Sequence, residues 1–251
     1  MHFKILTLFP ETIAPYLNSS ILGRAQTAGL IAVDYFNIRD YSLDKHRRVD
    51  DTPYGGGFGM LMMPQPLLDC HKAAVNGLSG RTRTIYFSPA GQKLDHKKAV
   101  FLKENYDNLV LLCGHYEGID QRVIDSVVDE EISVGDYVLT GGELPCAILV
   151  DAVSRLIDGV LPDVSCYTDE SIASGLLEYP QYTKPAVYDG KEVPQVLRDG
   201  NHADIVRWRR EMALEKTYYH RQELLFGADL DKNDLIFLEQ LRIRDSRLSK
   251  N

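Results

Sequence analysis

The chain has 251 residues, of which 44% are hydrophobic and 25% are charged. These values are typical of a globular protein, and the length suits one large domain or a large and a small one. Apolar runs stay below the roughly 18 residues of a membrane span, and the first residues lack a signal-peptide pattern, so we expect a cytoplasmic protein with no membrane partner. The net charge of −8 argues by itself against nucleic acid, and the cysteines and histidines show no metal-binding spacing.

Strand and helix patterns alternate from the N-terminus to about residue 156. Apolar and β-branched runs predict strands over 3–9, 31–38, 82–88, 108–113 and 131–134. Helical patterns lie between or after them, over 10–28, 64–75, 94–104, 119–128 and 144–156. This alternation is typical of an α/β domain with a parallel sheet, which we place at residues 1–160. A polar, glycine-rich segment at 40–59 is predicted to be a long loop.

The sequence changes character after about residue 160. Residues 161–200 contain several prolines and tyrosines with little periodicity, which predicts an interdomain linker with local order. Helical patterns over 203–219 and 231–248 then predict a small helical domain at 201–251.

Three predicted loops, 88–91, 113–118 and 134–143, follow the carboxyl ends of strands and are rich in glycine and small polar residues. Ligands of parallel sheets bind outside these ends, and glycine lets the backbone approach a ligand closely. The loops therefore favour a small-molecule site, although tight turns of an α/β fold are the alternative. A sulfonium donor would suit such a site, because a positive ligand tolerates no strong cation beside it.

The segment Asp50–Met60 combines two carboxylates with four glycines. It lacks the lysine of a phosphate-binding loop and the setting of a dinucleotide-binding turn, so nucleoside triphosphate or NAD binding is poorly supported. Contact with a substrate is favoured over a flexible hairpin.

Two further clusters carry charge. Arg155 and the stretch Thr168-Asp169-Glu170-Ser171 could supply an electrostatic and acid–base pair, or only surface ion pairs. Basic residues between 207 and 221 surround Trp208, the only tryptophan. They could bind RNA or form a solvated helix face.

The chain resembles the bacterial tRNA (guanine-N1)-methyltransferase family, one of the trefoil-knotted enzymes that use S-adenosylmethionine. The matching stretches occur in the family's order and span nearly the whole chain. They are Leu6–Glu11, Asp50–Met60, Ser88–Gly91, Leu112–Asp120, Ile132–Pro145, Gly175–Pro185 and Gly200–His202.

This resemblance implies a knotted parallel-sheet domain, a small helical C-terminal domain and a homodimer whose active site lies between subunits. The knot would hold S-adenosylmethionine, and the other substrate would be tRNA. Some members of the family need Mg²⁺; the chain shows no closed metal site, so any ion is expected at the substrate. The residues implied for the methyl donor are Tyr86, Phe87, Ser88, Pro89, Gly114, Tyr116, Val134, Gly135, Tyr137, Val138, Leu139, Gly141, Gly142 and Pro145.

The resemblance also implies the residues that act on guanine. Glu117 would accept hydrogen bonds from its Watson–Crick edge, and Arg155 would stabilise negative charge on O6. The family's general base is an aspartate before Ser-Phe; here Glu170 stands in that register before Ser171, with Asp169 as the alternative. Further tRNA contacts are implied for Asp50, Gly59, Asn201, His202, Trp208 and Arg209.

The implied reaction is methylation of N1 of guanosine 37 in tRNAs that carry guanosine at position 36. Two rival functions are a related knotted enzyme that methylates a ribose 2′-hydroxyl and a non-catalytic RNA-binding protein. The first would not need a carboxylate aimed at a base edge, and the second would not bind S-adenosylmethionine.

Overall fold

The structure is a computed structural model that describes residues 1–163, 167, 171–173 and 175–248. The chain divides into two compact units, Met1–Asp163 and Val164–Asn251, called here the N-terminal unit and the helical unit. Among the described residues, no helix combines the length and the apolar character needed to cross a membrane.

The N-terminal unit is built on a five-stranded sheet in which all neighbouring strands are parallel. The spatial order is β2 (Ala32–Asn37), β1 (His2–Thr7), β6 (Asn108–Leu112), β5 (Thr82–Lys93) and β7 (Glu130–Ser133). The central strand β6 is buried at every position, as expected for a strand covered on both faces. The predicted α/β class with a parallel sheet is thus confirmed.

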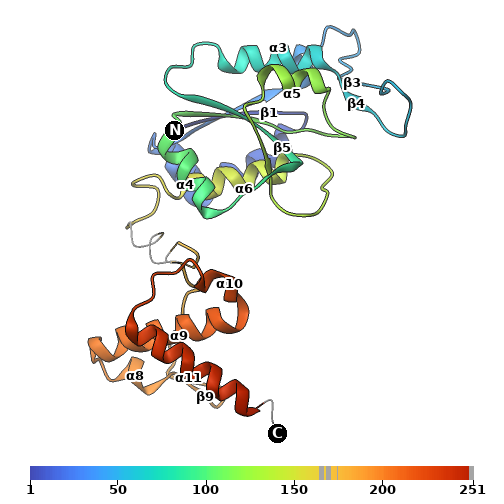
Figure 1. Ribbon diagram of the computed structural model, residues 1–251. Helices are drawn as coiled ribbons and strands as arrows, with labels where there is room; N and C mark the ends of the chain where they lie inside the picture. The colour runs from blue at the N-terminus through green and yellow to red at the C-terminus, as the bar shows by residue number, and fades with distance from the viewer. Residues whose placement is uncertain (164–166, 168–170, 174, 249–251) are drawn as a thin grey trace. The chain divides into compact units, whose positions relative to one another are not determined.

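Helices cover both faces of this sheet (Figure 1). On one face α3 (Pro64–Val75) and α5 (Gln121–Val127) pack over a core that includes Leu6, Leu67 and Leu112. On the other face α6 (Glu143–Ser154) contacts both α1 (Pro10–Leu17) and α4 (His96–Asn105). The chain folds this way because apolar side chains of both helix layers are removed from water against the two sheet faces.

The segment predicted as one helix over 10–28 forms two helices, α1 and α2 (Ser20–Thr27). Ser19 is extended and precedes Ser20, whose φ of +50° is incompatible with a continuous helix. The predicted long loop also contains short elements: the 3-10 helix η1 (Ile38–Tyr41) and strand β3 (Asp50–Asp51), which pairs with β4 (Leu61–Met62). We call residues 50–62 the 50–62 hairpin.

Strand β5 is longer than predicted and is interrupted. Phe87 and Gln92 both pair with Ile132 of β7, so residues 88–91 leave the sheet and return to it. Gly91 permits this path, because a Cβ there would lie 2.4 Å from the carbonyl carbon of Glu131. The residues on both sides of segment 88–91 pair with the same strand, β7.

The helical unit contains α8 (Gln195–Arg198), α9 (His202–His220), α10 (Gln222–Leu225), α11 (Lys232–Leu248) and a hairpin of β8 (Val187–Tyr188) with β9 (Lys191–Glu192). Its core gathers around Leu214, which is fully buried, together with Leu176 and Ala213. The amide of Leu177 donates to Thr217 Oγ1 at 2.8 Å. Part of the 161–200 segment therefore packs within this unit.

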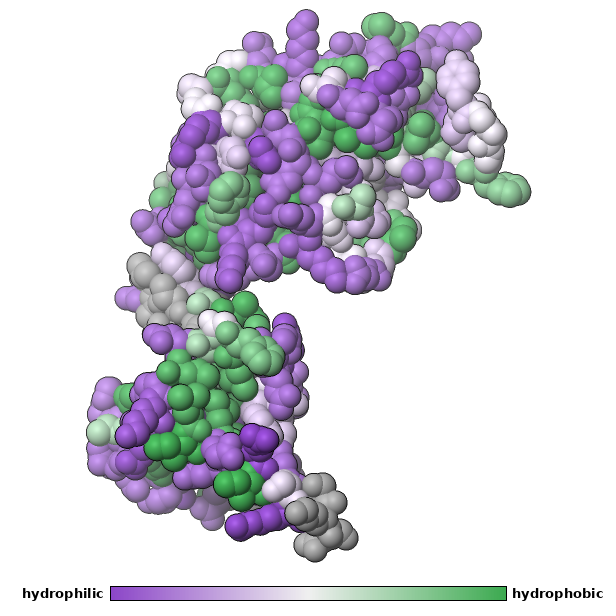
Figure 2. Space-filling view, in the orientation of Figure 1, coloured by the Kyte–Doolittle hydropathy of each residue, from purple (hydrophilic) through white to green (hydrophobic). Residues whose placement is uncertain are grey.

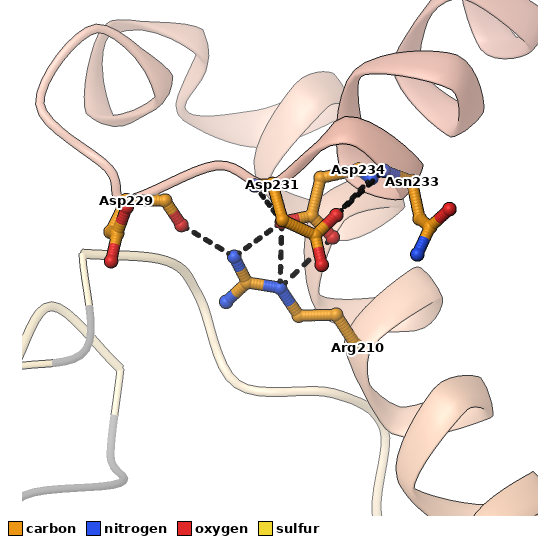
Figure 3. A network of polar contacts seen from close by, with 5 residues as sticks. All are labelled: Arg210, Asp229, Asp231, Asn233 and Asp234. Atoms are coloured by element: carbon orange, nitrogen blue, oxygen red, sulfur yellow. Dashed lines mark hydrogen bonds and ion pairs between the residues drawn. The ribbon is translucent and has the colours of Figure 1, made fainter.

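A polar network fixes the start of α11 to α9 (Figure 3). Arg210 donates to both carboxylate oxygens of Asp234 and to the carbonyl of Asp229. Asp231 and Asp234 cap the helix reciprocally: Asp231 Oδ1 accepts from the Asp234 amide, and Asp234 Oδ2 accepts from the Asp231 amide. Burial alone would raise the pKa of the Asp234 carboxyl, but these hydrogen bonds outweigh it and leave the pKa below its usual value.

Replacing Asp234 by alanine is expected to destabilise the helical unit by about 2 kcal/mol, because buried charge-assisted bonds are lost. Urea unfolding followed by the fluorescence of Trp208, which lies on α9, measures this. Because the folded pKa is depressed, the stabilisation is present near neutral pH and is lost as the pH falls below about 4. Asp204→Ala, which breaks two exposed contacts, the pair with Arg207 and a hydrogen bond from the Asn201 side-chain amide, is the control and should cost less than about 1 kcal/mol. Equal effects of the two variants would contradict the assignment.

Candidate functional site

A pocket of about 230 Å³ lies where β5 leaves the sheet after Phe87 and at the carboxyl ends of β6 and β7, the edge at which parallel sheets bind ligands. Its walls come from the three loops singled out in the sequence. The structure brings together around this pocket all fourteen residues implied for the methyl donor. They are Tyr86, Phe87, Ser88, Pro89, Gly114, Tyr116, Val134, Gly135, Tyr137, Val138, Leu139, Gly141, Gly142 and Pro145.

Two glycines are required where the loops meet. A Cβ on Gly142 would lie 2.6 Å from the Cα of Cys113, and one on Gly114 would lie 2.9 Å from the ring of Tyr86. The Gly142 amide donates to the Gly114 carbonyl at 2.9 Å, so the two loops share a main-chain contact. At these two glycines a ligand can approach the backbone of the pocket wall closely.

The charge of the pocket is unusual for a nucleotide site. The described residues that line it include no lysine or arginine, and Glu117 is their only carboxylate. Burial raises the pKa of the Tyr86 phenol, so this side chain stays neutral in the wall. Tyr116 and Tyr137 add aromatic surface. Such a lining suits a ligand that combines an aromatic ring with a positive charge and carries no phosphate.

A buried polar network lies behind the pocket and was not predicted from the sequence. Glu143, only 6% exposed, accepts from Thr7 Oγ1 at 2.5 Å and lies 2.8 Å from His115 Nε2. It joins the end of β1, the loop after β6 and the start of α6. A glutamate in the first turn of a helix is ordinarily a solvent-exposed residue that interacts favourably with the helix dipole. The role of Glu143 in linking three buried segments therefore became visible only in the fold.

Only some of the residues implied to act on guanine lie close together within one chain. Glu117 lines the pocket and touches the hairpin at Gly59, where a Cβ would lie 2.5 Å from Glu117 Oε1; Asp50 begins β3 of that hairpin. Arg155 directly follows α6, whose residue Pro145 lines the pocket, so the helix rise places Arg155 roughly 15 Å from Pro145. Asp169 and Glu170 lie outside the described residues.

The tRNA contacts implied for the helical unit gather at the start of α9. Asn201 caps the helix by accepting from the Ala203 amide, and His202 is its first residue. Trp208 lies 6.4 Å from the ring of Tyr182, and the Arg209 guanidinium lies 4.9 Å above the ring of Tyr179.

Most arginines of the predicted basic cluster are neutralised by neighbours. Arg207 pairs with Asp204, Arg210 with Asp234 and Arg221 with Glu223. Among the described residues, Arg209 has no such carboxylate partner. The cluster is therefore less basic than its sequence indicates.

No group of three or more histidine, cysteine or acidic side chains suitable for a metal ion occurs in the described part of the chain. The fold and the pocket define an α/β protein with a small-molecule-sized pocket at one edge of a parallel sheet.

Comparison with known proteins narrows this class. The pattern of the family described as "tRNA (Guanine-1)-methyltransferase TrmD" matches residues 1–226. The chain is 50% identical to a tRNA (guanine-N(1)-)-methyltransferase of Alkaliphilus oremlandii, over 96% of this chain and 99% of that protein. It is 53% identical to the protein of the same name from Ruminiclostridium cellulolyticum (89% and 96%) and 49% identical to that of Vibrio cholerae (96% and 98%). The chain belongs to the tRNA (guanine-N1)-methyltransferase family.

Proposed function

We propose that the chain transfers a methyl group from S-adenosylmethionine to N1 of guanosine 37, the nucleotide 3′ of the tRNA anticodon. The observation that supports this proposal most strongly is the pocket. Its described lining residues include several glycines and no lysine or arginine, and the Glu117 carboxylate borders it. Because the substrate is tRNA, the proposed reaction takes place in the cytoplasm.

The pocket fits the methyl donor by its chemistry. S-adenosylmethionine supplies an electrophilic methyl group on a positively charged sulfur. The backbone of Gly114 and Gly142 would approach the donor closely, while Tyr86 and Phe87 would provide apolar contact. We also propose that the loops form the family's trefoil knot.

Guanine N1 carries a proton, so this neutral nitrogen is a poor nucleophile. Glu117 would orient the base by accepting hydrogen bonds from the N1–H and the exocyclic amine. A carboxylate of the 168–171 stretch, Glu170 or else Asp169, would remove the N1 proton, a contribution of about 10²–10⁴-fold. Arg155 would stabilise the negative charge that develops on O6.

We propose that two chains build each active site, and the position of Arg155 supports this proposal. An arginine side chain cannot span the roughly 15 Å along α6 between Arg155 and Pro145, which lines the pocket. The outward face of α6 carries Leu144 and Ile148, 63% and 47% exposed and one helical turn apart. We propose that this face packs on a second copy, which brings Arg155 of one protomer to the pocket of its partner.

In the helical unit, Asn201, His202, Trp208 and Arg209 are proposed to contact the tRNA, while Asp50 and Gly59 do so beside the pocket. Any Mg²⁺ needed is proposed to be held by the RNA substrate.

Labelled S-adenosylmethionine and two tRNA transcripts test this function. A transcript with guanosine at 36 and 37 should be methylated, and one with adenosine at 36 should not. Glu170→Gln should lower kcat by about 10²-fold or more, and Asp169→Asn should have a small effect. Equal labelling of both transcripts would overturn the specificity, and a methyl on ribose would favour the 2′-hydroxyl rival. Full activity of both variants would overturn the base assignment.

A further inference from the structure

The tip of the 50–62 hairpin carries two aromatic side chains in solvent. Phe58 is 99% exposed, and Tyr54 is fully exposed. The hairpin projects beyond the layered body of the N-terminal unit, and hydrophobic surface lies at its tip (Figures 1 and 2). Single exposed apolar residues are common, but two aromatic rings on one projecting loop mark a contact surface.

The hairpin is attached to the loop that carries Glu117. The Glu117 amide donates to the Met60 carbonyl, and the Met62 amide donates to the Gly118 carbonyl, both at 3.0 Å. The close approach of Gly59 to the Glu117 side chain adds a third contact. The two rings are therefore anchored next to the residue proposed to hold the target guanine.

Exposed arginines surround the base of the hairpin. Arg48 pairs with Asp44, and Arg122 pairs with Asp120, whose amide donates to the Met62 carbonyl of the hairpin at 3.0 Å. A guanidinium has five N–H donors, so Arg48 and Arg122 keep donors that an RNA phosphate can accept from while the carboxylate pairs remain. Flat rings with arginines beside them are the combination that binds single-stranded nucleic acid.

We propose that Phe58, with Tyr54, stacks on an unpaired nucleobase next to the target guanine and so positions the RNA. This inference rests on the proposed function. Aromatic stacking accepts any base, because every base presents a π-face. The hairpin would therefore hold the loop of the RNA in place without reading its sequence.

The test compares Phe58→Ala, Phe58→Leu and Phe58→Trp in the full-length protein. Stacking is present in the bound ground state, so loss of the ring should raise KM for tRNA by roughly 5- to 150-fold with kcat little changed. Leucine should behave like alanine although it is apolar, and tryptophan should restore the wild-type KM. Leu43→Ala, at another strongly exposed apolar residue (83%), is the matched control and should leave KM unchanged.

Fluorescence gives a direct readout of stacking. A series of tRNAs carries 2-aminopurine at a single position, each at a different neighbour of guanosine 37. The wild type should quench the 2-aminopurine fluorescence of at least one of these tRNAs, and Phe58→Ala should quench none of them. Calorimetric titration with S-adenosylmethionine should give the wild-type affinity for every variant, since the pocket is untouched.

Three outcomes would overturn the inference. The first is a Phe58→Leu variant with the wild-type KM, and the second is quenching that persists in Phe58→Ala. The third is a change of oligomeric state of Phe58→Ala in sedimentation, which would identify a protein interface instead. If the wild type fails to methylate tRNA, the proposed function fails. If the wild type is active and Phe58→Ala is equally active, only this inference fails.

Discussion

Mixing two inactive variants, Glu117→Gln and Arg155→Ala, is expected to restore methyl transfer to about one quarter of the wild-type rate, since a two-fold dimer has two equivalent sites. Each homodimer carries a defect in both sites. In the mixed dimer, one site collects both substitutions and the other collects neither. Random pairing makes half of the dimers mixed, and half of their sites are intact.

The physical basis of this expectation is the length of α6. Glu117 borders the pocket at one end of the helix, and Arg155 follows the other end. If both acted from the same chain, every site in the mixture would be defective and no rate would return. Differently tagged, co-expressed chains measured with labelled donor distinguish the two cases.

Adding Leu144→Asp and Ile148→Asp to both chains provides the control, because a charged outer face should prevent dimer formation and abolish the rescue. Sedimentation should then show monomers. Mixed dimers that are verified by their tags but remain inactive would contradict a shared site.

Replacing Glu143 by alanine is expected to destabilise the N-terminal unit by about 3 kcal/mol, because a buried, hydrogen-bonded carboxylate leaves its partners unpaired. Thr7 is completely buried and His115 is largely so. The network ties three segments far apart in the sequence, so its loss should also weaken binding of S-adenosylmethionine.

Hydrogen exchange of the β1 and β6 amides measures this effect, because the only tryptophan lies in the helical unit and does not report on the sheet. Glu143→Gln, which keeps the shape and part of the bonding, should cost less than alanine. Glu104→Ala, at an exposed position of α4, is the control and should stay within about 0.5 kcal/mol. A cost below about 1 kcal/mol for Glu143→Ala would show that the network does not hold the segments together.

Much of the N-terminal unit could be predicted from local patterns. Helix α3 has the predicted bounds, and β6 was recognisable because an unbroken apolar run indicates a strand buried on both faces. The break between α1 and α2 could not be predicted, because the apolar spacing continues across Ser19 and Ser20. Periodicity reports which face is buried, but not whether the backbone turns within the segment.

The pocket could be predicted from the sequence, but the polar network behind it could not. Glycine-rich loops after strands can be recognised one at a time, and parallel topology brings their ends to one edge. The pairing of Thr7 with Glu143 joins residues 136 apart, and no local pattern records it. Likewise, the sequence indicates a basic face on α9, and only the fold shows that Arg207 and Arg210 have carboxylate partners.

The detour in β5 has a consequence for how the family's sequences can vary. Surface loops usually tolerate gain or loss of residues, but residues 88–91 leave and re-enter a strand that is in register with β7 on both sides. One extra residue would reverse the faces on which Gln92 and Lys93 lie or shift their pairing. This segment should therefore accept exchanges of side chain far more readily than insertions or deletions, and its length should be nearly invariant among working enzymes.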